Sequence, residues 1–138
     1  MKSGPFLIDT GFLVALVNAS DPAHSRCATA WAGLSGPFVT TEGVLAETAH
    51  MLRRNPRGFS TAWRLIASVG TVVAAPTRHR YERAIALMQK YSDVPMDLVD
   101  ALLVALGEET GVLSVLTLDT RGFDTYRAEA GKKFQRLP

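Results

Sequence analysis

The stretch Phe6–Leu16, FLIDTGFLVAL, is an apolar run interrupted by a single aspartate, Asp9. The short apolar segment before Asp9 predicts a buried strand, and the segment from Gly11 onward is long enough to form a helix. A carboxylate among apolar neighbours is costly to desolvate unless it is paired or coordinated. The stretch therefore predicts a strand followed directly by a helix, with an acid at the carboxyl end of the strand.

The triplet Asp9-Thr10-Gly11 also matches the active-site triplet of aspartic proteases. Those enzymes are all-β, and their triplet lies in a loop between strands. Here a helical run follows the triplet in a mostly helical chain, and a match of three residues arises easily by chance. A second explanation for Asp9 is that it caps the following helix, which is a common role for aspartate.

Strands and helices alternate along the rest of the chain. The helix expected at 21–34 opens with Asp21 as N-cap and Pro22 in the first helical position. The helix expected at 96–111 is apolar on almost every side, which indicates burial. Further strands are expected at 36–41, 71–76 and 112–119, with a short edge strand in 132–137, and further helices at 41–54, 59–70 and 77–92.

This alternation predicts an α/β fold with a mainly parallel sheet of four to five strands, covered by helices on both faces. The chain has 138 residues, which is the size of one domain, and its 47% hydrophobic and 20% charged residues exclude a disordered chain. A net charge of +2 is too small to indicate nucleic acid by itself. We expect a soluble, cytoplasmic protein, because one cysteine cannot form an internal disulfide and no apolar stretch is long enough to span a membrane.

Four acids stand out against this fold: Asp9, Glu47, Asp100 and Asp119. In open parallel sheets the functional site lies beyond the carboxyl ends of the strands, where Asp9 and Asp119 are expected. Each acid also has an ordinary explanation. Asp119 can belong to a turn, Glu47 can be solvated beside an apolar stripe, and Asp100 can form a capping arrangement with Asp97.

Taken together, these acids indicate a metal site. Clustered carboxylates repel one another, which favours protonation or a bound cation. Oxygen ligands suit Mg²⁺ or Mn²⁺, and the sequence has no His and Cys set of the kind that zinc prefers. The histidines His24, His50 and His79 show no metal-binding spacing, so we expect structural or surface roles for them.

Four segments, FLIDTGFLVAL, TTEGVLAETAHMLRR, PMDLVDALLVALGEETG and VLTLDTRGFDTYR, resemble in order the four acidic blocks of PIN-domain nucleases. They are most similar to the VapC-type toxins of bacterial toxin–antitoxin pairs. The resemblance covers nearly the whole chain and implies one PIN-like domain over 1–138, an α/β/α sandwich that binds Mg²⁺ or Mn²⁺ and cuts RNA. By this resemblance Asp9, Glu47, Asp100 and Asp119 are the catalytic and metal-binding acids, and Thr10, Thr117 and Asp97 support them.

The resemblance also implies an RNA substrate, an antitoxin partner, and a homodimer or toxin–antitoxin hetero-oligomer. Two arginine clusters are candidates for RNA phosphate contacts, with solvated helix ends as the alternative explanation. The apolar residues Phe12, Leu13, Leu16 and Val17 can line a partner groove, although a core role is the simpler explanation. The arginine clusters are Arg53, Arg54 and Arg57, and Arg78, Arg80 and Arg83.

Two other functions stay open. One is a PIN-domain nuclease that works in RNA processing without an antitoxin, which neighbouring genes would distinguish. The other is a non-catalytic binding domain of the same fold, whose acids are helix caps or hold a structural metal. Metal-dependent RNA cleavage separates the nucleases from the binding domain.

Overall fold

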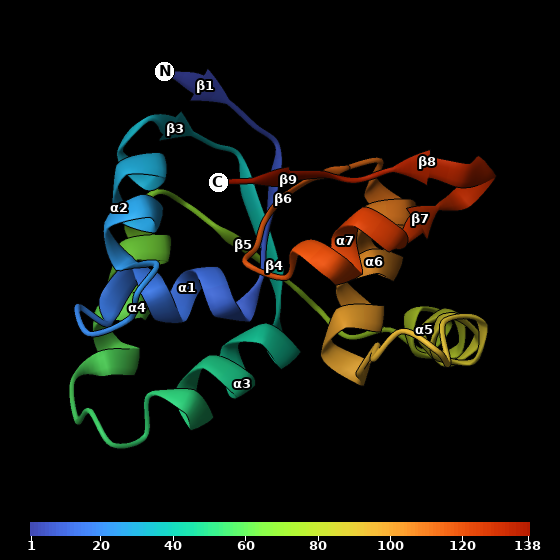
Figure 1. The fold of residues 1–138 in the computed structure, drawn as a ribbon, viewed down its shortest axis with the longest axis horizontal. Helices are drawn as coiled ribbons and strands as arrows, with labels where there is room; N and C mark the ends of the chain where they lie inside the picture. The colour runs from blue at the N-terminus through green and yellow to red at the C-terminus, as the bar shows by residue number, and fades with distance from the viewer.

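The computed structural model describes residues 1–138 and is built around a five-stranded sheet in which every neighbouring pair of strands is parallel (Figure 1). The first acidic block provides the central strand, with neighbours from both halves of the chain. The predicted mainly parallel sheet of four to five strands is confirmed. In spatial order the strands are β5 (Val72–Ala74), β4 (Phe38–Thr41), β2 (Phe6–Ile8), β6 (Ser114–Leu116) and β9 (Gln135–Leu137).

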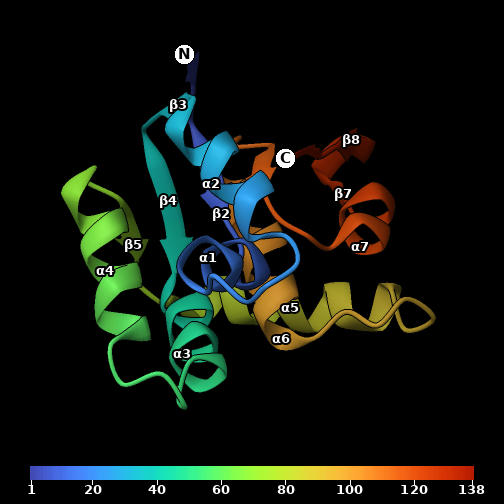
Figure 2. The ribbon, with the colours of Figure 1, turned by 60° about the vertical axis from the view of Figure 1, so that its left-hand side comes forward.

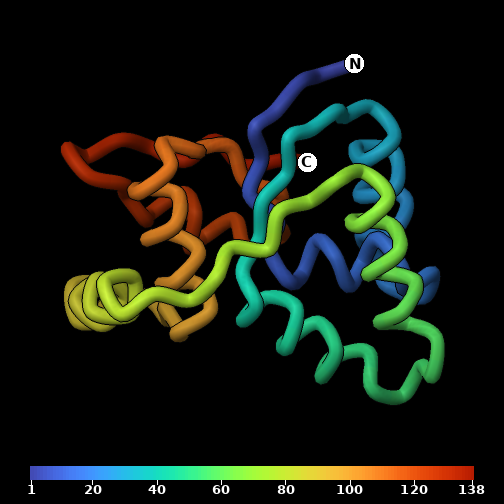
Figure 3. Tube along the Cα trace, turned by 180° about the vertical axis from the view of Figure 1, so that it is seen from behind, coloured from blue at the N-terminus to red at the C-terminus, as the bar shows by residue number.

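Helices cover both faces of the sheet, as the alternation of elements predicted (Figure 2). On one side lie α1 (Thr10–Val17), α2 (His24–Ala32) and α4 (Gly58–Ser68), and on the other lie α5 (Arg78–Lys90), α6 (Leu98–Thr110) and α7 (Thr120–Thr125). Helix α3 (Glu42–Met51) lies beyond the carboxyl edge of the sheet and contacts both α1 and α6. Figure 3 shows how the β5 segment takes the chain from α4 on one side to α5 on the other.

Side-chain alternation along the two central strands divides the core into two clusters. Leu7 and Val115 point to the face covered by α5 and α6, whereas Ile8 and Leu116 point to the face covered by α1, α2 and α4. Successive residues of a strand face opposite sides, so a fully apolar strand fills both cores. This accounts for the unbroken apolar run before Asp9.

The helix expected to be buried is buried. In α6 every residue from Ala101 to Gly107 is buried, and the helix ends at Gly111 in the left-handed conformation (φ 72°). Gly107 lets the helix approach its neighbours closely, because an added Cβ would lie 2.8 Å from the Val112 carbonyl oxygen and 2.9 Å from the Phe134 ring. The apolar residues of α1 also belong to the core: Phe12, Leu13 and Leu16 are buried, and Val17 packs against them.

The start of one helix needs correction, and several short elements were not expected. Helix α2 begins at His24 and not at Pro22, because the Asp21 carboxylate accepts from the Ala23 amide (2.9 Å) and holds a turn before the helix. Within 132–137 only β9 joins the main sheet. The remaining short elements were not predicted from sequence: helix α7, the parallel pair β1 (Lys2–Ser3) and β3 (Leu34–Ser35), and the antiparallel pair β7 (Arg127–Ala128) and β8 (Lys132–Lys133), which are joined by the 3-10 turn η1 (Glu129–Gly131).

None of the helices is both long enough and apolar enough to cross a membrane.

Candidate active site

The pairing of β2 with β6 brings two of the predicted site residues together. Leu7 pairs with Val115 and Ile8 with Leu116, and the Asp9 amide donates to the Leu116 carbonyl oxygen (2.9 Å). The next residue on each strand is therefore Asp9 or Thr117, at the carboxyl edge of the sheet. A buried hydrogen bond joins them, since the Thr117 hydroxyl donates to Asp9 Oδ2 at 2.7 Å.

Asp9 is both a helix cap and a buried acid. Its Oδ1 accepts from the Thr10 amide (2.9 Å) at the start of α1, which bears out the capping explanation. The side chain is nevertheless only 6% exposed. Burial raises the pKa of Asp9 from 3.8 to about 6, against the lowering effect of the Thr117 and Thr10 hydrogen bonds, and the carboxylates of Asp119 and Glu47 raise it further. Capping alone does not account for this carboxyl, because burial and neighbouring carboxylates both disfavour its ionised form.

Asp97 and Asp100 form a capping box at the start of α6. The Asp100 amide donates to Asp97 Oδ1 (2.8 Å), and the Asp97 amide donates to Asp100 Oδ2 (3.2 Å). This arrangement fixes Asp100 where it faces the end of the sheet. Partial burial raises the pKa of Asp100 to about 8, and the carboxylates of Asp97, Asp9 and Asp119 add to that shift.

Thr117 also connects Asp9 to the fourth acid. The Asp119 amide donates to the Thr117 hydroxyl oxygen (3.0 Å), and Asp119 Oδ1 accepts from the Gly122 amide (2.9 Å), capping α7. Any side chain at position 122 would collide with the Asp119 carboxylate and the Tyr126 ring, so this tight turn requires glycine. A single hydroxyl thus links the ends of two adjacent strands and both of their acids.

Glu47 reaches the same edge from α3. That helix follows β4 directly, and Thr41 caps it by accepting from the Val44 amide (3.2 Å). Glu47 is half-buried, makes no hydrogen bond or ion pair, and is close enough to Asp9 to raise its pKa. The four predicted acids therefore act on one another electrostatically, although they come from four separate segments of the chain.

No basic side chain neutralises these acids. All four ion pairs of the structure lie elsewhere: Arg78–Glu82, Arg80–Glu109, Arg83–Glu108 and Arg136–Asp124. Beside Asp9, the Thr10 hydroxyl is buried without a hydrogen-bond partner. Unpaired carboxylates and an orphaned hydroxyl are the surroundings expected where a charged ligand is bound.

These residues fit a hard divalent cation held largely through water. No three acidic, histidine or cysteine side chains converge closely enough to form a complete set of direct ligands. Mg²⁺ keeps several of its waters in proteins and is usually bound by one or two carboxylates. Asp9 and Asp100 are the two acids whose pKa values are raised by burial and by neighbouring carboxylates.

The candidate RNA-binding arginines divide into two groups. Arg53, Arg54 and Arg57 are exposed at the turn between α3 and α4, away from the start of α3, and Arg53 donates to the His50 carbonyl oxygen (2.9 Å). The second group divides further, because the Arg78 side chain is 93% exposed, as a solvated helix end would be, whereas Arg80 and Arg83 are held by glutamates. Arg80 is buried and bonds to Glu109 and to the Ala75 carbonyl oxygen, Arg83 pairs with Glu108, and Arg78 pairs with Glu82.

The histidines are structural or on the surface, as expected. His24 Nδ1 lies 2.8 Å from the Ala15 carbonyl oxygen, and His50 and His79 are exposed. Cys27 is buried.

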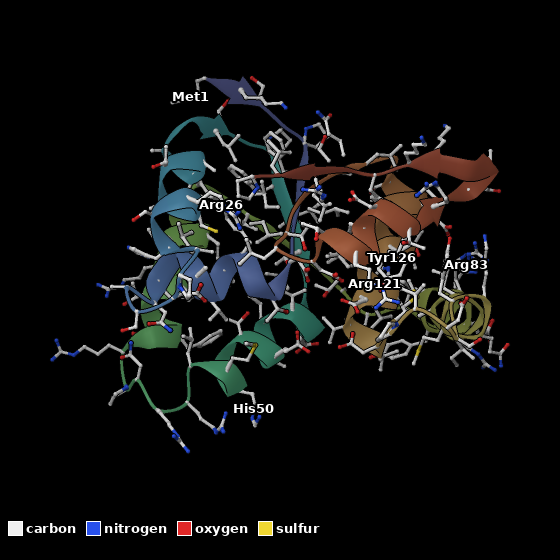
Figure 4. All side chains as sticks on the ribbon, in the orientation of Figure 1. Met1, Arg26, His50, Arg83, Arg121 and Tyr126 are labelled. Carbon is white, nitrogen blue, oxygen red and sulfur yellow. The ribbon has the colours of Figure 1, made fainter.

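Sequence reasoning missed Tyr126, a fully buried residue whose pKa is raised by burial first and then by Asp100 and Asp119. Its hydroxyl has no hydrogen-bond partner. Figure 4 shows Tyr126 and Arg121 on the α7 side of the molecule. The stretch after Asp119 has no helical period, so nothing in the sequence indicated that this tyrosine faces the acids.

Comparison with known proteins agrees with this geometry. The family model described as PIN domain matches residues 6–129, which include all four acids. This chain belongs to the PIN-domain family. The resemblance of its four acidic blocks to that family is therefore confirmed.

Among individual PIN-domain proteins, the chain is 32% identical to Ribonuclease VapC26 of Mycobacterium tuberculosis over 146 residues, covering 96% of this chain and 99% of the relative. Its structure is similar to the crystal structure of Mycobacterium tuberculosis VapC20, a sarcin–ricin loop cleaving toxin. The TM-score is 0.77 at 26% identity, and the match covers 85% of this chain and 92% of VapC20. The expected PIN-like α/β/α fold is thus confirmed.

Proposed function

We propose that this protein is a metal-dependent endoribonuclease that hydrolyses RNA phosphodiester bonds and is the toxin of a toxin–antitoxin pair. The observation that carries the proposal is the group of four unpaired, mutually interacting acids at the carboxyl edge of the sheet. The names of the relatives, a VapC ribonuclease and a VapC toxin, support RNA as the substrate.

In this proposal Asp9 and Asp100 hold Mg²⁺ or Mn²⁺, with Glu47 and Asp119 as direct or water-mediated ligands. When bound, the ion supplies a water of lowered pKa and positive charge beside the scissile phosphate. The protein contributes orientation. The Thr117 hydroxyl and the Thr10 amide fix the two oxygens of Asp9, and Asp97 fixes the backbone of Asp100. One of the carboxylates accepts the proton that the water loses.

The four acids also keep this edge of the sheet negatively charged while no ion is bound. Because no arginine or lysine pairs with the acids, an RNA phosphate is repelled from the metal-free edge. Cleavage should therefore depend on the divalent ion for substrate binding as well as for chemistry.

The test is cleavage of a mixed RNA pool by purified protein, with and without Mg²⁺ or Mn²⁺. Asp9→Asn and Asp100→Asn each replace a carboxyl group with an amide of nearly the same size. We expect metal-dependent cutting by the wild type and its loss in both variants. Metal-independent cutting, or full activity in both variants, would contradict the proposal.

The partners of this function are an RNA substrate and a cognate antitoxin that covers the acidic edge, in a homodimer or a toxin–antitoxin hetero-oligomer. We also propose a cytoplasmic location, where cellular RNA would be available as substrate. Arg53, Arg54 and Arg57 are an exposed basic surface that can contact RNA phosphates. A small reading frame beside the gene would favour the toxin over an RNA-processing nuclease, and co-purification of its product would identify the antitoxin.

A further inference from the structure

A small cavity lies immediately beside Asp119, between the segment that precedes α6 and helix α7. Its volume is about 130 Å³. Val94 and Pro95 contribute apolar side chains to its lining, and Asp119 and Arg121 contribute an acidic and a basic one. The lining residues are Val94, Pro95, Asp119, Arg121, Gly122 and Tyr126.

Arg121 is the basic residue of this cavity, and its guanidinium is free. Its side chain is exposed and makes no hydrogen bond or ion pair, unlike Arg80 and Arg83, which are held by glutamates. Figure 4 shows Arg121 beside Tyr126 on the α7 side. A free arginine next to an acidic edge is suited to an anionic group that the acids alone would repel.

Tyr126 forms the floor of the cavity. Its ring is held edge-on between Tyr91 and Phe123, with centroids 5.2 and 5.4 Å away, and Gly122 leaves room for it. The Tyr126 hydroxyl is buried without a partner. Buried hydroxyls are nearly always hydrogen-bonded in folded proteins, and phenylalanine would fill the same space without the desolvation cost. The orphaned hydroxyl is therefore a hydrogen-bonding group that a ligand can satisfy once the side chains that seal the cavity floor move aside.

We propose that this cavity is a subsite for one nucleotide of a single-stranded RNA, adjacent to the phosphate that is cut at the acidic edge. Arg121 contacts a backbone phosphate, the base lies against Val94 and Pro95, and the Tyr126 hydroxyl hydrogen-bonds a polar atom of the nucleotide. The cavity is equivalent to about four water molecules of ~30 Å³ each, which suits one heterocycle and excludes a base pair. Proteins commonly read single-stranded RNA by drawing an unstacked base into such a pocket. This inference rests on the proposed function.

The first test separates a ligand contact from a structural role. Tyr126→Phe removes only the orphaned hydroxyl, so its thermal stability should equal or exceed that of the wild type. Tyr81→Phe is the matched control, because Tyr81 is exposed on α5 and does not line this cavity. A loss of stability in Tyr126→Phe would mean that the hydroxyl already has a partner within the fold, and would overturn the inference.

The second test measures RNA binding in the Asp9→Asn background, where the probe is not consumed. The probe is a short fluorescein-labelled RNA of random sequence, followed by anisotropy over a salt series with Mg²⁺ present. Arg121→Gln should weaken binding about tenfold and reduce the magnitude of the salt slope by about 0.7, as for one lost phosphate contact on a single strand. Tyr126→Phe should weaken binding about fivefold without changing the slope. Arg64→Gln is the control for an exposed, unpaired arginine away from the cavity.

The outcomes distinguish this inference from the proposed function. If the wild type cuts RNA but Arg121→Gln and Tyr126→Phe bind the probe as their parent does, the subsite is wrong and the nuclease stands. If the wild type neither cuts nor binds RNA with any divalent ion, the proposed function fails and the subsite fails with it. Weaker binding in both variants, with the Tyr81 and Arg64 controls unchanged, supports the subsite.

Discussion

Asp9→Asn should make the protein more stable at neutral pH while abolishing its activity. The Asp9 carboxyl is almost completely buried, and its pKa is raised from 3.8 to about 6. At about 1.4 kcal/mol per pH unit, holding this group ionised in the folded protein costs about 3 kcal/mol. Asparagine keeps the acceptor for the Thr10 amide and loses the charge. Because the contact with Thr117 becomes weaker, we expect the free energy of unfolding to rise by about 1–3 kcal/mol.

The pH dependence of this gain in stability follows from the direction in which the pKa of Asp9 is shifted. Because the folded state holds the Asp9 proton more tightly than the unfolded state, wild-type stability falls as pH rises from about 4 to about 6. The variant lacks this group, so its advantage in stability should be absent in acid and should appear as pH rises from about 4 to about 6. Asp9 is also one of the charges that raise the pKa of Asp100, so Asp9→Asn lowers the pKa of Asp100 as well and should widen the gap further as Asp100 ionises, up to about pH 8.

The assay is thermal and urea unfolding of wild type and Asp9→Asn in EDTA over a pH series. For a chain of this length the expected gain corresponds to a Tm increase of about 4–12 °C at neutral pH. Added Mg²⁺ should then raise the Tm of the wild type and narrow the gap, because the ion binds the folded carboxylates. A gap that is independent of pH, or a less stable variant at neutral pH, would refute the reasoning that Asp9 is held as an uncompensated buried acid.

Three further predictions concern other contacts. Thr117→Val removes the 2.7 Å bond to Asp9, so it should destabilise the fold by about 1–2 kcal/mol and shift the acidic limb of the pH–rate profile upward, measured by RNA cleavage across pH. Arg80→Met leaves Glu109 without its partner and should reduce the unfolding free energy by about 2–3 kcal/mol in urea. Gly107→Ala places a Cβ against backbone and an aromatic ring, and should lower stability by about 2–4 kcal/mol in the same assay.

Each of these variants has a matched control. Thr110→Val removes a hydroxyl that donates to the Leu106 carbonyl oxygen and accepts from the Val112 amide, with no bond to any of the four acids, and should leave the pH–rate profile unchanged. Arg78→Met breaks an exposed pair and should cost less than about 0.5 kcal/mol. Gly43→Ala adds a Cβ whose nearest neighbours lie at 3.7 Å, an ordinary contact, so it should be tolerated. Equal effects in a variant and its control would show that the named contact is not the cause.

The main elements of the fold were predictable because they depend on local patterns. A short apolar run that ends in an acid marks β2 and Asp9, and a helix that is apolar all round marks α6 and Asp100. Since parallel strands end at a common edge, those patterns also placed Asp9 and Asp119 together. The capping explanations proved compatible with the site, because Asp9, Asp97 and Asp119 all cap helices in the structure.

The rest depended on contacts between remote segments. In the sequence, Arg80 looks like a surface residue of an amphipathic helix. It is buried in the structure because it bonds to Glu109, which lies 29 positions away in the chain. The sequence of helix α7 has no helical spacing of apolar residues, so it could not be predicted. The helix forms where Asp119 caps its start and Phe123 packs in the core. The environment of Tyr126 is likewise set by Tyr91 and by acids from other elements. No local pattern carries that information.

The pairing of β6 with β9 bears on when the protein becomes active during its synthesis. The Thr117 amide donates to the Leu137 carbonyl oxygen (2.8 Å), so the strand that carries the linking hydroxyl is supported by residues made much later than Asp9. The ribosome adds about 5–20 residues per second, which puts Leu137 roughly 1–4 s behind Asp119. A nascent chain that already contains all four acids therefore still lacks the edge that aligns them. We therefore expect a chain that stops short of β9 to be inactive as a nuclease, even though it contains every one of the predicted acids.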